Sequence, residues 1–334
     1  MKIKKINVYQ KTVKALVFGL VSSVSINACA ASVPDNYAQR ADVKNFISEM
    51  VDQHGFDRAY LEAKFASAKR LDNVLESIAK PAEKELTWKQ YRPIFVTDKR
   101  SNKGLKFIQT HHKTLLRAEK EYGVPVEIIA AIIGVESYYG KRTGKYTVFD
   151  SLTTLGFDYP KRSKFFKSEL KQFLLLSKEE NIDIDTMTGS YAGAMGMPQF
   201  ISSSYRHYAV DFDGDGKRDL WNSTEDVIGS VANYFSEHGW KTDATVTHRV
   251  SVANKAIVKK KNTLKPYVTI DQLKKQGVKV DAALDGKQLV SLLKFKGKHG
   301  DEYWLGLKNF YVITRYNHSE LYAMAVFQLS EKFK

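Results

Sequence analysis

The sequence VEIIAAIIGVESYY occupies residues 126–139. Its isoleucines recur at the spacing of one helix face, which predicts a helix buried in the protein core. Glu136 follows two of these isoleucines by three and four positions, so its carboxylate lies on the same apolar face. A desolvated carboxylate holds its proton near neutral pH, as a general acid must. A buried ion pair, or escape to solvent at the helix end, is the alternative. Gly134 and Gly140 open space around the carboxylate and favour a cleft.

Helical patterns extend on both sides of this run. Apolar residues recur at helical spacing over residues 43–80 and 104–122, and similar patterns continue to about residue 239. Gly123-Val124-Pro125 ends one helix and starts the next, with the proline near the first turn. The helical pattern returns over residues 321–333. Most of the chain is therefore expected to be helical.

A different pattern follows Trp240. Valines alternate with polar residues, and short apolar runs are separated by Gly and Asp, which predicts a small β-rich insert over residues 242–310. Residues 310–314 (FYVIT) form either its last strand or an irregular return. These patterns together indicate an α+β protein.

The composition limits the class of protein. Of 334 residues, 43% are hydrophobic and 27% are charged, which excludes disorder or a coiled coil as a description of the whole chain. A single Cys excludes an intramolecular disulfide and a cysteine-only zinc site. The formal net charge of +15 suggests an anionic partner, and nucleic acid is the first class to consider.

The N-terminus carries the features of a secretory signal peptide over residues 1–28. Lysines precede a short apolar run over residues 15–26, and small residues follow it. The apolar run is too short to span a bilayer as a stable helix. Export argues against a nucleic-acid partner and favours an anionic envelope polymer or a membrane surface. A merely solvated basic surface is the alternative.

Two cleavage positions fit this signal peptide. Residues 26–29 (INAC) resemble a lipoprotein box, which would place a lipid anchor on Cys29, although Asn27 is an imperfect match. Cleavage after Ala30 would instead discard Cys29 and leave a soluble periplasmic protein. The lone Cys at this position favours the anchor. Because no acidic retention signal follows Cys29, we expect a periplasmic lipoprotein of the outer membrane.

The segment SYAGAMGMPQF, residues 190–200, is rich in small residues and ends in polar and aromatic groups. Its glycines let a ligand approach backbone donors closely, while Gln199 and Phe200 offer an amide and a ring to a sugar. A tight turn between helices is the alternative. The segment is not a phosphate loop, because the Walker lysine and spacing are missing.

Residues 211–221 (DFDGDGKRDLW) resemble the first three quarters of an EF-hand calcium loop. The expected ligands are the side chains of Asp211, Asp213 and Asp215 and the backbone of Lys217. The loop departs from the EF-hand pattern at position 12, where Asn222 replaces the bidentate Glu.

Two acids further along the chain could close this loop in place of Asn222. They are Glu225 and Asp226, provided that the loop is longer than twelve residues. The alternative is helix capping, since Ser223 and Asp226 form a Ser-x-x-Asp helix start.

Other enzyme classes find little support. There is no His-Glu-x-x-His zinc motif and no Gly-x-Ser-x-Gly elbow. A glycosidase with two carboxylates would need a second acid, and none lies near Glu136 in sequence.

Several of these motifs together resemble the membrane-bound lytic murein transglycosylase B family, in order and over most of the mature chain. They are residues 134–137 (GVES), 190–200, 211–221, 228–235 (IGSVANYF) and 315–317 (RYN).

The resemblance implies a fold of class α+β, mainly α, with a core like that of goose lysozyme. Residues 111–241 would form this catalytic core, including the EF-hand-like loop. Residues 33–110, completed by 311–334, would form a helical domain, and residues 242–310 a small inserted β domain.

The resemblance also implies a reaction, namely cleavage of the β-1,4 bond between N-acetylmuramic acid and N-acetylglucosamine without water, which leaves a 1,6-anhydromuramoyl end. Glu136 matches the family's single catalytic acid, which then acts as base. No catalytic cofactor is expected, and a calcium ion in the longer loop is expected to be structural, with Asp226 favoured as its closing ligand. Peptidoglycan strands are the expected partner of a monomer, beside the membrane and other cell-wall enzymes.

The substrate-binding residues that the resemblance implies are Ser190, Gln199, Phe200, Tyr234, Tyr316, Asn317, Tyr91 and Arg162. Lys161 and Phe165 depart from the family pattern, where Arg and Tyr are expected, so the preference for saccharide or stem peptide stays open. Two other functions also stay open, a hydrolytic lysozyme and a non-catalytic peptidoglycan-binding protein. An acid on an apolar helix face argues against the second.

Overall fold

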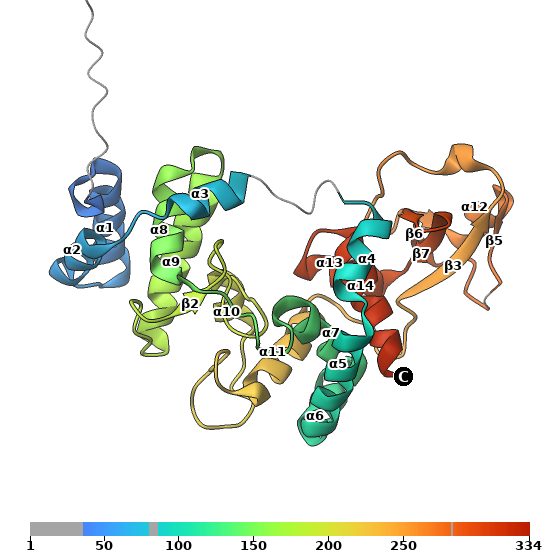
Figure 1. Cartoon of the computed structure of the whole chain (residues 1–334), viewed down its shortest axis with the longest axis horizontal. Coiled ribbons are helices and arrows are strands. Elements are labelled where there is room, and N and C mark those ends of the chain that lie inside the picture. The colour runs from blue at the N-terminus through green and yellow to red at the C-terminus, as the bar shows by residue number, and fades with distance from the viewer. Residues whose placement is uncertain (1–35, 80–85, 282) are drawn as a thin grey trace, which may run out of the picture. The chain divides into compact units, whose positions relative to one another are not determined.

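The computed structural model describes residues 36–79, 86–281 and 283–334 (Figure 1). This part of the chain is mainly helical and contains a five-stranded antiparallel sheet and a short two-stranded one. The predicted fold class, α+β and mainly α, is therefore confirmed. The predicted signal peptide (1–28) and Cys29 lie outside the described residues.

The elements are named in chain order. The helices are α1 (Ala41–His54), α2 (Arg58–Ser67), α3 (Asp72–Ala79), α4 (Trp88–Phe95), α5 (Asp98–Thr110), α6 (His112–Tyr122), α7 (Val126–Ser137), α8 (Val148–Asp158), α9 (Ser163–Glu179), α10 (Ser202–Tyr208), α11 (Thr224–Glu237), α12 (Ile270–Lys275), α13 (Lys308–Tyr316) and α14 (Glu320–Ser330). The strands are β1 (Tyr146–Thr147), β2 (Thr188–Gly189), β3 (Thr247–Val252), β4 (Val268–Thr269), β5 (Val278–Lys279), β6 (Leu289–Gly297) and β7 (Gly300–Gly306).

The start of the described chain is hydrogen-bonded to the buried carboxylate of Asp158 in α8. Asp158, the last residue of α8, accepts hydrogen bonds of 2.5 Å from both the Tyr37 hydroxyl and the Arg40 guanidinium. Its side chain is only 8% exposed. Removing one partner of such a buried pair is costly, because the other charge is left uncompensated. The start of the described chain is thus tied to α8, 118 residues further along from Arg40.

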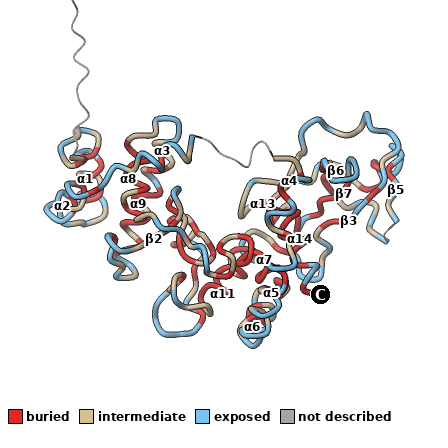
Figure 2. The backbone as a smooth tube through the Cα atoms, viewed as in Figure 1, coloured by how far each residue is buried: buried red, intermediate tan, exposed pale blue. Residues whose placement is uncertain are grey.

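Helix α7 runs through the centre of the core, as its sequence predicts. All of its residues except Glu127 and Glu136 are buried, and Figure 2 shows the corresponding stretch of buried backbone. Helices α5, α6, α11 and α14 pack around it. An apolar helix enclosed on several sides needs no polar face, which explains why its sequence is hydrophobic almost throughout.

The sheet lies in the segment between α11 and α13, and its strand order is β4-β6-β7-β3-β5. Strands β6 and β7 form a hairpin that turns at Lys298 and His299, between Gly297 and Gly300. The sheet has a hydrophobic core of its own, built around Val290, Leu292 and Leu305. The domain boundaries proposed from the sequence stay predictions.

Residues 310–314 are neither a strand nor an irregular return, as the sequence pattern suggested, but part of helix α13. The start of this helix is held by Asn309, whose side chain bonds to the backbone of Lys241 and Ala244. Phe310 and Ile313, three residues apart, are buried. Tertiary packing here overrides the β propensity of the segment.

Candidate active site

Glu136 lies in the last turn of α7, and the helix stops directly after it. Tyr138 and Tyr139 have φ angles of 54° and 57°, and Gly140 follows with 77°. Two successive non-glycine residues in the left-handed region store strain, which the surrounding structure must hold in place. The carboxylate is therefore carried at the half-buried end of a rigid core helix.

The space beside Gly134 is not an open cleft next to the carboxylate, as the sequence suggested. The ring of Tyr139 fills it: a Cβ at Gly134 would lie 2.5 Å from the Tyr139 hydroxyl oxygen. That hydroxyl donates a hydrogen bond of 3.1 Å to the backbone carbonyl of Arg100 on α5. The glycine is needed because the chain folds back over the helix immediately after Glu136.

The partner of Glu136 comes from the other end of the described chain. The hydroxyl of Tyr322, in the first turn of α14, donates a hydrogen bond of 2.5 Å to Glu136 Oε1. Burial and the neighbouring Glu136 carboxylate raise the pKa of Tyr322 well above its usual value, so the hydroxyl keeps its proton and acts as donor. The sequence does not single out Tyr322, because a Tyr within an apolar helical run gives no sign of a role in a site.

Aromatic side chains continue from Tyr322 into a cluster. The Tyr316 ring stacks on the Tyr322 ring at 6.4 Å and 12°, and its hydroxyl bonds to the Pro198 carbonyl at 2.6 Å. Its ring centroid lies 4.8 Å from that of Tyr234 and 5.7 Å from that of Phe200. Three of the predicted substrate residues, Tyr316, Tyr234 and Phe200, therefore form one aromatic cluster with Tyr322, although they come from distant parts of the sequence.

The segment 190–200 is folded tightly on itself. Ser190 Oγ accepts hydrogen bonds from the amides of Ala192 and Ala194, at 3.2 and 3.0 Å. Gln199 takes a φ of 53°, and its side-chain nitrogen donates to the carbonyls of Thr143 and Gly196. The Gln199 nitrogen is thus engaged by the protein, and its amide oxygen is the atom that this residue can offer to a ligand.

Other predicted substrate residues have different surroundings. Tyr91 and Phe200 are 1% and 2% exposed, so in this structure their rings support the site from behind rather than offer a surface to a ligand. Asn317 follows α13 directly after Tyr316. Arg162 is exposed, and its guanidinium lies 4.2 Å from the Phe165 ring centroid.

The EF-hand-like loop brings together three of its acids. Carboxylate oxygens of Asp211, Asp213 and Asp226 all lie within 4.8 Å of one another. Backbone amides hold two of them in place, since Asp211 accepts from Gly214 and Asp226 accepts from Phe212 at 2.6 Å and from Asp219. A set of fixed carboxylates is the donor set that calcium prefers.

The remaining predicted metal residues are arranged differently. Asp215 and Glu225 do not belong to this three-acid group. Asp215 accepts the amide of Lys217 at 2.9 Å. Of the three candidates for the closing position, the geometry favours Asp226 over Glu225 and Asn222, and Asp226 also keeps the N-terminal capping contact with Ser223.

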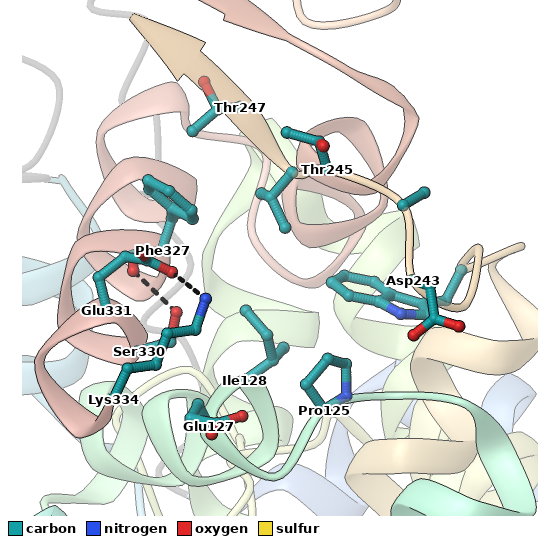
Figure 3. A pocket seen from close by; sticks show the side chains of 13 residues that line it. Pro125, Glu127, Ile128, Asp243, Thr245, Thr247, Phe327, Ser330, Glu331 and Lys334 are labelled. Carbon is teal, nitrogen blue, oxygen red and sulfur yellow. Dashed lines mark hydrogen bonds and ion pairs between the residues drawn. The ribbon is translucent and has the colours of Figure 1, made fainter. Parts of the chain in front are cut away.

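A separate pocket lies at the opposite end of α7 from Glu136 (Figure 3). Its volume is about 370 Å³, and its acidic members are Glu127, Asp243 and Glu331. Glu127 and Glu136 are nine residues apart on one helix, or roughly 13 Å along its axis. This acidic pocket is therefore distinct from the site around Glu136.

The family model of the transglycosylase SLT domain matches residues 38–331. The membrane-bound lytic murein transglycosylase B of Escherichia coli (strain K12) is 43% identical over 306 residues, which cover 89% of this chain and 83% of that protein. The chain belongs to the lytic murein transglycosylase B family. It is an enzyme, a lytic transglycosylase of peptidoglycan.

Solved structures of relatives share the fold of this transglycosylase. The soluble lytic transglycosylase SltB1 of Pseudomonas aeruginosa is 47% identical with a TM-score of 0.84, over 87% of this chain and 98% of that one. The Escherichia coli lytic transglycosylase Slt35 in complex with calcium is 43% identical with a TM-score of 0.83, over 89% and 94% of the two chains.

The relatives of the transglycosylase differ in how they are described with respect to the membrane. One is named membrane-bound and another soluble. In the described part of this chain, the helices are too short or too polar to cross a bilayer.

Proposed function

We propose that Glu136 alone carries the acid and base steps of peptidoglycan cleavage. As an acid it gives its proton to the glycosidic oxygen, and the bond from that oxygen to C1 of the muramoyl residue breaks. As a carboxylate it then takes the proton of the muramoyl 6-hydroxyl while O6 forms a bond to C1. The proton returns to Glu136, no water is consumed, and the product is a 1,6-anhydromuramoyl end.

The hydrogen bond between Tyr322 and Glu136 is the observation that carries this proposal. A donor at 2.5 Å holds the Glu136 carboxylate in one orientation. Burial and the Glu136 carboxylate raise the pKa of Tyr316 and of Tyr322 well above the usual value, so both tyrosines keep their protons beside Glu136. With Glu136 as the one proposed carboxylate, the nucleophile must belong to the substrate.

The proposed substrate-binding residues fall into two groups. Ser190, Gln199, Asn317 and Arg162 have atoms available to a ligand, and we assign them to direct contacts with glycan or stem peptide. The buried Tyr91, Phe200 and Tyr234 and the partly buried Tyr316 form the support that holds Tyr322 and the segment 190–200 in place.

We also propose a structural calcium ion held by Asp211, Asp213 and Asp226. The calcium-bound relative and the spacing of these carboxylates support it. The ion would neutralise three converging charges and fix the start of α11, on which Tyr234 lies. A calcium ion has no proton to give or take, so we assign it a role in folding rather than in the reaction.

A lipid on Cys29 is the proposed link to the outer membrane, with the catalytic part in the periplasm. The lipoprotein-like residues 26–29 and the membrane-bound relative support this placement. The substrate, peptidoglycan, lies in the same compartment.

Product analysis tests the proposed reaction. The wild-type enzyme is incubated with purified peptidoglycan, and the muropeptides are separated and weighed by mass spectrometry. Muramoyl ends lighter by one water than lysozyme products are expected. Reducing ends as the main product would instead show that water attacks C1, which is the reaction of a hydrolase.

A further inference from the structure

A second cavity lies where α4, α14 and the β6–β7 hairpin meet. Its volume is about 550 Å³. Trp88 and Arg92 line it from α4, Trp304 from β7, Lys298 from the hairpin turn and Gln328 from α14. A neighbouring cavity of about 410 Å³ shares Arg92, Trp304 and Gln328 with it, so the two adjoin along the surface.

The charges on this surface are mostly of one sign. Lys89, Arg92, Arg249 and Lys298 line the larger cavity, are exposed, and have no carboxylate within ion-pair distance among the described residues. Glu302 is the acid among the lining residues. Unpaired cations around one cavity favour an anionic ligand.

The cavity also holds two tryptophans whose indole N–H groups lack an acceptor in the described part of the chain. Trp88 is 1% exposed, and Trp304 has the Arg249 guanidinium 5.9 Å from its ring centroid. Buried polar groups are normally hydrogen-bonded, so two unmatched donors beside one cavity are unusual. Trp88 is too buried to offer a surface, but Trp304 is partly exposed, and its aromatic face next to cationic groups suits a sugar that carries carboxylates.

The pocket in Figure 3 differs from the basic cavity in the charge of its lining residues. It contains Glu127, Asp243 and Glu331, and Glu331 is paired with Lys334. An anionic strand would be repelled there and attracted to the cavity at α4. Glu331 also lines the smaller cavity next to the basic one, together with Lys332, so the contrast in charge holds for the larger cavity, which we take as the candidate for an anionic polymer.

The basic cavity is connected to the active site through α14. Tyr322 and Gln328 are six residues apart on this helix, which is roughly 9 Å along its axis. Helix α4, which carries Trp88 and Arg92, packs against α14. A strand held in the cavity would thus lie next to the helix that carries the partner of Glu136.

We propose that this cavity is a second binding site for peptidoglycan, which holds a carboxylate-bearing glycopeptide portion of a strand outside the cleavage site. It contributes affinity for the polymer and takes no part in bond cleavage. The proposal relies on peptidoglycan as the substrate, and it is independent of the role of Glu136.

The test is co-sedimentation of full-length protein carrying Glu136→Gln with insoluble peptidoglycan. In this background, Arg249→Gln together with Lys298→Gln is compared with Lys275→Gln together with Lys279→Gln. The second pair removes the same charge from exposed positions of the same sheet region outside the cavity. The cavity pair should weaken binding about 3- to 10-fold, as expected for two exposed charge contacts, and the control pair should not.

Enzyme kinetics and a vesicle-binding measurement complete the test. In the otherwise wild-type enzyme, Arg249→Gln with Lys298→Gln should leave turnover of a short soluble muropeptide unchanged and slow the digestion of intact peptidoglycan. Unchanged binding by the cavity pair, or an equal loss in the control pair, would overturn the proposal. The proposal would also be overturned if the cavity pair lost binding to phosphatidylglycerol vesicles but still bound peptidoglycan, because the cavity would then bind an anionic membrane. Cleavage by Glu136→Gln, measured in parallel, reports on the catalytic proposal alone.

Discussion

The Tyr322 hydroxyl lies 2.5 Å from a carboxylate oxygen of Glu136, although 186 residues separate the two in sequence. Glu136 lies in the last turn of the core helix α7, and Tyr322 lies in the first turn of α14. The packing of these two helices therefore sets the orientation of the proposed catalytic group. Changes to either residue should affect the reaction in different ways.

Glu136→Gln should abolish most turnover while glycan binding survives. The amide keeps the size of the side chain but cannot give and reclaim a proton, so we expect a loss of about 100- to 10,000-fold or more. Glu127→Gln, on the same helix but in the acidic pocket, is the matched control and should retain activity. Unimpaired cleavage by Glu136→Gln, measured as release of soluble muropeptides, would remove Glu136 from the mechanism.

Tyr322→Phe should lower kcat with little change in KM. It removes the hydrogen bond to Glu136 but keeps the ring that stacks on Tyr316. A hydrogen bond to a charged group is worth about 1.5–3 kcal/mol, so a loss of roughly 10- to 100-fold is expected. Tyr311→Phe on α13 is the control. A lower melting temperature without a change in kcat would show that Tyr322 is only structural.

Calcium should raise the melting temperature relative to a chelator, because the ion binds the folded loop and relieves repulsion among its acids. Asp211→Ala should remove this difference. Asp226→Asn should reduce it strongly and Glu225→Gln should not, since only Asp226 belongs to the carboxylate group. Identical melting curves in calcium and chelator for the wild-type protein would mean that the loop is only a turn.

Gly134→Ala should destabilise the fold by about 1–3 kcal/mol, the usual cost of overpacking a core. The added methyl group would collide with the Tyr139 ring. Gly156→Ala in α8 is the control, because its new Cβ would meet mainly the Lys167 side chain at 3.3 Å. There the gain in helix propensity, up to about 1 kcal/mol, offsets the contact. Urea denaturation of both variants distinguishes these outcomes, and equal stabilities would contradict the packing described at Gly134.

Protein extracted from membranes should have an intact mass that corresponds to a chain starting at Cys29 with added acyl groups. Cys29→Ser should lack this mass and appear in the soluble fraction. A wild-type chain that starts at Ala31 and carries no acyl mass would contradict the anchor while leaving export in place.

Local signals explain what could be predicted from the sequence. The periodicity of α7 places Glu136, and the spacing of Asp211 and Asp213 defines the metal loop, because each feature is encoded within a dozen neighbouring residues. Tyr322 could not be found in this way, since the run 321–326 (LYAMAV) looks like any buried helix. Its role depends on the packing of α14 on α7.

Aromatic residues also show that a sequence pattern does not reveal the role of a side chain in the site. Tyr91 and Phe200 were expected to contact substrate, and both are buried. A ring has the same sequence signal whether it lines a binding site or supports one. The expectation of open space at Gly134 is wrong for a related reason, because nothing in the local sequence pattern shows that the Tyr139 ring occupies this space.

The long sequence separation between Glu136 and Tyr322 has a consequence for biosynthesis. While the ribosome is still adding the residues that follow α7, Glu136 has no Tyr322 hydroxyl to orient it, and one flank of α7 is uncovered. The catalytic arrangement can form only once the chain has been synthesised through α14. We therefore expect the nascent enzyme to be inactive until that point, which delays the onset of a wall-degrading activity, and a chain that stops before Glu320 should release no muropeptides.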